Sequence, residues 1–290
     1  MSPTSRVNVP YTMLPGEGIL VGAFDNFVVF RAGDLSMLVV LLDAGANINK
    51  QNSMGHTALF LAAENVNPLP KSVLLGQEDT TDDLSLVQHL LERGADKDLG
   101  DADGVSPIMI AAIKGHTEVV NELMTNEAKL EERDVKDHTI LHYAAMNNRH
   151  EVLSLLATYN QELVNEMVNM PNYMENTALH LAAQAGHLQT VKELLRKKLS
   201  EEGEETEEYI YAVDVDNKNW DEQTPSHLAA AEGHSEVLRV LLYNDPHTIF
   251  DKDEEDNTPL HLAATRKQSC TAEALLAAGG DQEYHNSTCT

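Results

Sequence analysis

The stretch Thr258-Pro259-Leu260-His261-Leu262-Ala263-Ala264 is the clearest copy of a pattern that recurs along this chain of 290 residues. Five related copies precede it, and they begin at Thr57, Ser106, Thr139, Thr177 and Thr224. Two intervals between successive starts are 33 and 34 residues, and the others, of 38, 47 and 49 residues, equal 33 plus insertions of 5, 14 and 16. A recurring period of this size indicates an array of stacked repeats and not a single globular core.

Other residues recur in register with the motif. An Ala-Ala pair follows every start by five and six residues, and Gly-His comes next in three copies, for example at Gly115-His116. A leucine recurs seventeen residues after most starts, as at Leu123 and Leu241. Counting back from the earliest of these residues places a degenerate first unit at Phe24, where the threonine and histidine are missing.

A 33-residue period with Thr-Pro-Leu-His-x-Ala resembles the ankyrin repeat. The resemblance implies an all-α, ankyrin-repeat solenoid of stacked helix-turn-helix units with extended finger loops. About seven units are expected over residues 20–282, between a flexible leader at 1–19 and a tail at 283–290. The intervals longer than 33 residues place insertions near residues 65–83, 158–170 and 196–213.

The residue types at each position of the motif have physical reasons. Alanine has the highest helix propensity, and its small side chain lets a neighbouring helix approach closely. Threonine at the start suits a helix N-cap, and proline beside it suits the first helical turn. Gly115 is expected to end its helix, because glycine adopts a positive φ at little cost. The second helix of each unit should bury one apolar face, since its apolar residues are spaced three and four apart.

The recurrent histidines have two interpretations. A row of four histidines could bind a metal ion, but Phe60 and Met109 occupy the same position in other copies, and no cysteine pair has zinc-site spacing. The ankyrin resemblance implies instead that these histidines tie adjacent fingers together through hydrogen bonds. We therefore expect no metal and no cofactor. Structural roles are assigned to the motif residues Thr139, His142, Thr177, His180, Thr224, His227, Thr258 and His261.

The charge of the chain restricts its partners. Lys and Arg total 20 against 47 Asp and Glu, which gives a net charge of −27. Such a surface repels nucleic acids and anionic membranes and attracts basic partners; alternatively, the acidity only keeps the array soluble. No secretory signal is apparent, the apolar segment 19–30 is too short to span a bilayer, and two cysteines give no disulfide framework. A cytoplasmic location is the resulting expectation.

The resemblance also implies where a partner binds, because ankyrin arrays generally use their finger tips and the concave face of the first helices. The finger before Thr224 contains the only tryptophan of the chain beside acidic residues, and the finger before Thr258 is also acidic. An exposed tryptophan with a charged rim is typical of an interface anchor; alternatively, its ring packs on the neighbouring finger. The predicted ligand is another protein, through a Lys/Arg-rich segment. The candidate binding residues are Trp220, Asp221, Glu222, Asp253, Glu254 and Glu255.

The sequence favours a non-catalytic interaction module or scaffold. It contains neither the Gly-x-Ser-x-Gly nucleophile motif nor a phosphate-binding Gly-x-x-x-x-Gly-Lys loop. The alternative is a cytosolic repeat region of a larger protein, because similar arrays precede the pore of transient receptor potential channels of the A subfamily. The acidic run 201–208, which follows Arg196-Lys197-Lys198, is either a helix extension with complementary charges or a mobile loop. The oligomeric state stays open.

Overall fold

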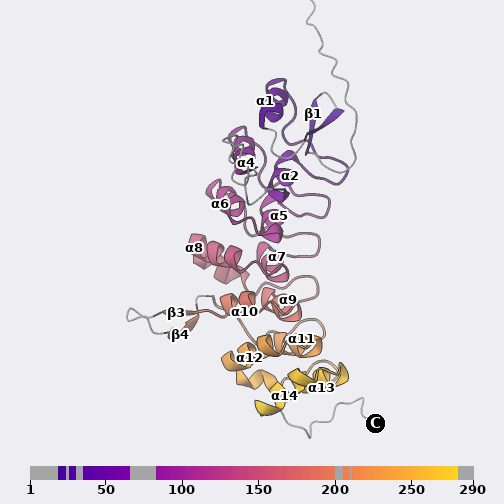
Figure 1. Cartoon of the computed structure of the whole chain (residues 1–290), viewed down its shortest axis with the longest axis vertical. Coiled ribbons are helices and arrows are strands. Elements are labelled where there is room, and N and C mark those ends of the chain that lie inside the picture. The colour runs from indigo at the N-terminus through magenta and orange to yellow at the C-terminus, as the bar shows by residue number, and fades with distance from the viewer. Residues whose placement is uncertain are drawn as a thin grey trace, which may run out of the picture. The chain divides into compact units, whose positions relative to one another are not determined.

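The structure is a computed structural model that describes residues 19–23, 26–30, 35–65, 83–199, 205–209 and 211–279. It divides into two compact units, Met1–Ala102 and Asp103–Thr290, which we treat separately. Both contain short helices joined by loops (Figure 1). Nearly all of the predicted leader, most of the first insertion and the C-terminal tail lie outside the described residues.

The first unit begins with a β-hairpin where a helix was expected. Strands β1 (Ile19–Ala23) and β2 (Asn26–Phe30) pair antiparallel, and they precede α1 (Leu35–Asp43), α2 (Ala58–Glu64) and α4 (Asp83–Glu92). The degenerate unit expected to start at Phe24 therefore has strand β2 where its first helix was expected, and Phe24 itself lies outside the described residues. Strand β2 consists mainly of valine and phenylalanine, and β1 contains isoleucine and valine; these residue types favour extended backbone over helix.

The second unit is a two-layered array of helix pairs. Its described elements are α5 (Pro107–Lys114), α6 (Thr117–Thr125), α7 (Ile140–Met146), α8 (His150–Met167), α9 (Ala178–Gln184), α10 (Leu188–Leu194), β3 (Lys197–Leu199), β4 (Glu205–Tyr209), α11 (Pro225–Glu232), α12 (Ser235–Asn244), a 3₁₀ turn (Pro246–Ile249), α13 (Pro259–Thr265) and α14 (Ser269–Ala277). The first helices α5, α7, α9, α11 and α13 pack in succession, and α6, α8, α10, α12 and α14 form the second layer. The predicted solenoid of helix-turn-helix units is confirmed.

The motif residues behave as their chemistry suggests. The Ala-Ala pairs are fully buried in units such as that of Ala111 and Ala112, where the first helices pack against their neighbours. The glycine after the first helix is left-handed at Gly115, with φ of 81°. Glycine is not required there, however, because Asn148 and Lys267 adopt the same conformation at the equivalent positions, with φ of 56° and 60°.

The second insertion continues the helix of its unit. Helix α8 is interrupted at Asn160, whose φ of −153° and ψ of 86° are not helical. The Asn160 side chain accepts a hydrogen bond from the backbone N–H of Leu163 at 3.1 Å, so it caps the helical segment that follows. Val164 and Met167 of this segment are buried, and the insertion thereby adds to the core.

Of the acidic run 201–208, residues 205–208 lie in strand β4, where a helix extension or a loop was expected, and residues 201–204 lie outside the described residues. Strands β3 and β4 pair antiparallel with a register shift between Lys197 and Leu199, and Figure 1 shows the hairpin projecting beyond α10. Tyr211 follows the hairpin and is fully buried, and its hydroxyl donates to the carbonyl of Leu153 at 2.9 Å. This buried ring fixes the base of the hairpin against α8.

Two glycines of the first unit separate the cost of a left-handed backbone from the cost of a steric clash. Gly55 and Gly94 both have a φ of 82°, but a Cβ at Gly55 would lie 2.4 Å from the backbone N of Ala102, whereas one at Gly94 meets nothing within 4 Å. We predict that Gly94→Ala lowers the free energy of unfolding by about 1 kcal/mol. Gly55→Ala should lower it by about 3 kcal/mol or more, because two backbones must separate.

Hydrogen exchange of the amides in α2 and α4 measures both effects locally. Equal losses of protection in the two variants would contradict the close approach of the loop at Gly55 to Ala102.

Candidate functional site: the finger loops

Each finger turns through the same bond between side chain and backbone. The Asn172 Oδ1 accepts the backbone N–H groups of Met174 and Asn176, at 2.9 and 3.0 Å. An Asn or Asp stands five residues before the motif start in all six copies, a regularity that sequence reasoning missed. The turn bonds are present at Asn52, Asp134, Asn172, Asn219 and Asp253.

Backbone hydrogen bonds tie consecutive fingers into a ladder. The residue four before the motif start donates its N–H to a carbonyl of the preceding finger: Tyr173 to Lys136 at 3.0 Å, and Trp220 to Met174 at 3.1 Å. Glu254 makes the same bond to Asp221 at 3.1 Å. Since only backbone groups take part, the side chain at this position is free to vary without loss of the ladder.

The motif histidines connect each first helix to the next finger. The His180 Nδ1 accepts the backbone N–H of Thr177 at 3.2 Å, and its Nε2 lies 2.9 Å from the carbonyl of Gln223 in the following repeat. Because Nδ1 faces an N–H donor, we assign the ring proton to Nε2, which then donates to the carbonyl. The same arrangement joins His142 to the Asn176 carbonyl and His227 to the Asn257 carbonyl, both at 3.0 Å.

Burial keeps these histidines neutral. Desolvation lowers the pKa of His142, His180 and His227 from 6.5 to about 4, although the hydrogen bond to the next finger acts in the opposite direction. Both ring nitrogens are engaged, so none of the three is available as a metal ligand. Within the described ranges, no three His, Cys, Asp or Glu side chains are arranged to hold a metal ion.

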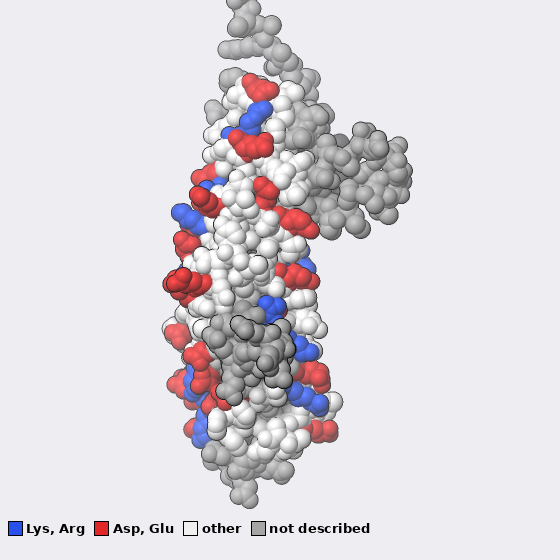
Figure 2. All heavy atoms as spheres, turned by 90° about the vertical axis from the view of Figure 1, so that its left-hand side faces the viewer, with Lys and Arg blue, Asp and Glu red and all other residues white. Residues whose placement is uncertain are grey.

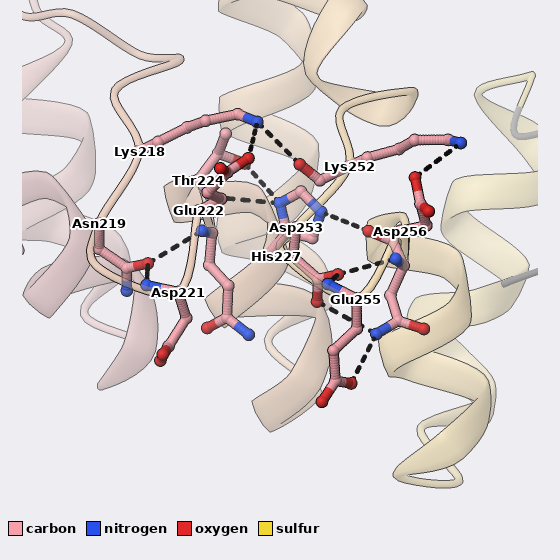
Figure 3. Close-up of polar contacts among 12 residues, drawn as sticks. Lys218, Asn219, Asp221, Glu222, Thr224, His227, Lys252, Asp253, Glu255 and Asp256 are labelled. Carbon is pink, nitrogen blue, oxygen red and sulfur yellow. Dashed lines mark hydrogen bonds and ion pairs between the residues drawn. The ribbon is translucent and has the colours of Figure 1, made fainter. Parts of the chain in front are cut away.

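Asp221, Glu222 and Glu255 lie on two consecutive fingers (Figure 3), which the backbone bond from Glu254 to Asp221 joins, and Trp220 is the residue directly before Asp221. The Trp220 side chain is 67% exposed, so its ring is not packed away on the neighbouring finger. Glu222 is exposed and has a positive φ of 54°, and its carboxylate lies 3.3 Å from the Lys218 ammonium. The Asp221 carboxylate points away from these contacts. Glu254 is also exposed, on the finger that the ladder joins to Asp221.

Asp253 does not belong to the exposed surface, contrary to the prediction. It is only 7% exposed, and its Oδ1 accepts the backbone N–H groups of Glu255 and Asn257, at 3.0 and 2.7 Å. Its Oδ2 accepts from the Asn257 side chain at 3.2 Å. Asp253 holds the turn of its finger, a role that Asn172 and Asn219 fill in the two preceding fingers.

Negative charge accumulates on these two fingers. Residues 214–223 contain four acidic residues and one lysine, and residues 251–257 contain five and one. A hydrogen bond to the Asp216 carboxyl, together with burial and the Asp216 charge, raises the pKa of Asp214 to about 6. Burial raises the pKa of Asp251 as well. By contrast, acidic and basic side chains are mixed on the face of the molecule turned to the viewer in Figure 2.

Family comparisons agree with the repeat geometry. The family model described as "Ankyrin repeats (3 copies)" matches residues 77–166 and 199–286, and that described as "Ankyrin repeats (many copies)" matches residues 141–195. The chain belongs to the ankyrin repeat family, as its motif predicted. Proteins of this family generally bind other proteins.

The curated relatives are larger proteins of several kinds. "Ankyrin repeat and KH domain-containing protein mask-1" of Caenorhabditis elegans is 38% identical over 31% of this chain and 3% of its own length. "Mitochondrial disaggregase" of Bos taurus is 30% identical over 48% of the chain and 20% of its own length. "Transient receptor potential cation channel subfamily A member 1" of Drosophila melanogaster is 23% identical over 57% of the chain and 16% of its own length. The chain thus matches at most a fifth of each of these relatives.

Among the described residues, none of the helices combines the length and the apolar character that crossing a membrane demands.

The buried histidines predict a loss of stability in mild acid. Their pKa is lowered on folding, so the unfolded chain binds more protons below pH 6.5 and stability falls from there toward pH 4. We expect a loss of about 2 kcal/mol per histidine between pH 7 and pH 5. Urea unfolding at each pH, followed by circular dichroism, measures the change.

A His180→Gln variant provides the control. It should be less stable than the parent at pH 7, because the bond to the Gln223 carbonyl is altered, but should lose less stability on acidification. A parent chain that is equally stable at pH 7 and pH 5 would refute a neutral, buried role for these histidines.

Two adjacent acidic residues should differ sharply in their effect on stability. Asp253→Ala removes the acceptor of three hydrogen bonds in a buried turn and should cost about 2 kcal/mol. Glu254→Ala removes an exposed side chain and should leave stability nearly unchanged, because its backbone bond to Asp221 is retained. Thermal unfolding of both variants tests the assignment, and a smaller loss for Asp253→Ala than for Glu254→Ala would show that it is wrong.

Proposed function

We propose that this chain is a non-catalytic interaction module that captures a Lys/Arg-rich segment of a partner protein on the fingers of its last two repeats. The observation that supports it most directly is the exposure of Trp220 among acidic side chains. Asp221, Glu222, Glu254 and Glu255 form the acidic rim in this proposal. Asp253 supports the rim from beneath by holding its turn.

Trp220 suits an anchor because its backbone is fixed before any ligand arrives. Its N–H is bonded to the Met174 carbonyl, and Asn219 beside it accepts the N–H groups of Asp221 and Gln223. A residue whose backbone is already ordered loses less conformational entropy on binding. Tryptophan also combines a large apolar area with an N–H donor, which is why it is frequent among the residues that dominate interface energies.

The acidic rim suits a cationic ligand. The raised pKa values of Asp214 and Asp251 reflect carboxylates that lie near one another or are partly buried, and a basic side chain would relieve this repulsion. The ion pairs of Lys218 with Glu222 and of Lys252 with Asp256 are exposed, and such pairs contribute little stability. Replacement of these lysines by a partner's cations therefore costs little free energy.

The structural roles of the motif residues support the non-catalytic part of the proposal. The threonines and histidines that recur along the chain are engaged in capping and in bonds between repeats, as at Thr177 and His180. The same acidity argues against nucleic acid and membrane surfaces as partners and fits a cytoplasmic location.

A second candidate is a repeat region within a larger protein, such as an ion channel of the transient receptor potential A type. The similarity of 57% of the chain to the Drosophila channel favours it. The array boundaries at residues 20 and 282 remain part of this proposal.

Selection of ligands from a random peptide library displayed on phage tests the binding proposal. Peptides captured by residues 1–290 should be enriched in Lys and Arg and should bind more weakly at raised salt. Trp220→Ala should weaken them about tenfold or more, and the charge reversals Glu254→Lys and Glu255→Lys should do the same.

The matched control is the pair of charge reversals Glu118→Lys and Glu151→Lys on α6 and α8, which changes the net charge equally but lies outside the fingers. Capture of basic peptides that responds equally to both pairs, and not to Trp220→Ala, would place the binding site elsewhere.

A further inference from the structure

Three consecutive fingers present an apolar side chain at the same position. Val135, Tyr173 and Trp220 each stand four residues before a motif start, and they are 68%, 52% and 67% exposed. The backbone ladder joins these fingers in order. Val135 donates its N–H to the carbonyl of Asp103, Tyr173 donates to that of Lys136, and Trp220 donates to that of Met174. These three side chains, which we call the apolar row, therefore follow one another along the finger tips of the second unit.

A second set of residues runs beside the apolar row. Two residues beyond each of its members stands an acidic residue with a positive φ: Asp137, Glu175 and Glu222, with φ of 58°, 59° and 54°. Gly104 holds the equivalent place on the preceding finger, so an acid is not what the turn itself needs. Each of these acids thus adopts a left-handed backbone at the place that Gly104 holds on its finger.

The polar atoms of the two rings are available to a ligand. Within the described part of the chain, neither the Tyr173 hydroxyl nor the Trp220 indole N–H makes a hydrogen bond. The Tyr173 ring is steadied by an edge contact with His138, with the ring centroids 6.3 Å apart. Two donors thus stand exposed on neighbouring fingers, and a ligand that offers free carbonyl oxygens along its backbone would satisfy both.

We propose that the apolar row is the docking surface for a basic, proline-rich segment in the polyproline II conformation, with one apolar side chain of the ligand on each finger. This inference rests on the proposed function and names the class of segment that the fingers accept. The ligand repeats an apolar residue every third position, and Lys or Arg between these positions faces Asp137, Glu175 and Glu222.

The spacing of the repeats favours this conformation over a strand. Packed helices of neighbouring repeats are about 8–10 Å apart, and we infer the same spacing for the fingers that follow them. A polyproline II helix has three residues per turn and rises about 3.1 Å per residue, so residues i and i+3 lie on one face about 9 Å apart. In a β-strand, residues on one face are about 7 or 13 Å apart, which matches neither one finger nor the next.

The hydrogen-bonding groups disfavour an α-helical ligand. A helix uses its own carbonyls internally and would leave the Tyr173 hydroxyl and the Trp220 N–H without acceptors, whereas the carbonyls of polyproline II are free. An apolar helix face also needs a groove, but the row consists of side chains that project from finger tips. A proline-rich segment is already extended before it binds, so little conformational entropy is lost.

Fluorescence anisotropy with three labelled synthetic peptides and the full chain of 290 residues tests this inference. The first peptide is (Leu-Pro-Arg)₄. The second has the same twelve residues with the leucines gathered at its two ends, and the third is a helix-forming basic peptide with leucines spaced three and four apart. We expect the first to bind at least about tenfold more tightly than the others, because only it places an apolar residue on every finger.

Variants of the chain locate the bound peptide. Trp220→Ala should weaken binding of (Leu-Pro-Arg)₄ about tenfold or more, and Tyr173→Ala should also weaken it. Tyr173→Phe, which retains the ring, should weaken it less than Tyr173→Ala does. Tyr243→Ala is the matched control, because Tyr243 is 78% exposed on α12 and outside the fingers, and it should leave the affinity unchanged.

Each other outcome overturns a defined part of the argument. If the rearranged peptide binds as tightly as (Leu-Pro-Arg)₄, or if Tyr243→Ala weakens binding as much as Trp220→Ala, the apolar row is not the docking surface. If the helical peptide binds best and depends on Trp220, the polyproline II inference fails while the proposed capture of basic segments stands. If no basic peptide binds in a manner that depends on Trp220, both fail.

Discussion

The array depends on one buried hydrogen bond that recurs with the repeat: the bond from a motif histidine to a carbonyl of the next finger. His142, His180 and His227 each accept a backbone N–H within their own unit and donate across to the following one. Inside a low-dielectric interior such a bond is strong, and its loss would leave buried polar groups unpaired. Because each ring must be neutral to accept and donate at once, the spacing of the fingers is coupled to proton binding.

Within each finger, residues that hold the fold stand directly beside residues whose side chains are exposed. Backbone groups and the turn residues, such as Asn219 and Asp253, carry the bonds that hold each finger to itself and to its neighbour. The side chains between them, such as Trp220 and Glu254, contribute no bond that the fold requires. Variation at these places leaves the stack intact, which explains how one architecture accommodates many binding specificities.

Much of the fold follows from local chemistry and was therefore predictable from the sequence. The caps at Thr139 and Thr177, the buried Ala-Ala pairs and the stacked helix pairs all follow from the repeated motif, because each copy has the same neighbours. The features that depart from the repeat were harder to predict from the sequence. The β1–β2 and β3–β4 hairpins occur once each, so no second copy exists to indicate their structure. The turn residue five before each motif was visible as a regularity, but acidic and amide side chains at finger positions were interpreted as surface.

The sequence alone determined the period, the class of fold and the residues that hold repeats together, because these depend on contacts that recur at a fixed separation along the chain. It also identified Trp220 and an acidic environment, since composition is visible without coordinates. Only the tertiary structure separated Asp253, buried as an acceptor in its turn, from Glu254, exposed beside it. Only the tertiary structure showed that Val135, Tyr173 and Trp220 are exposed on fingers joined in succession, because the backbone ladder keeps the fingers in register although insertions of different length separate them in the chain.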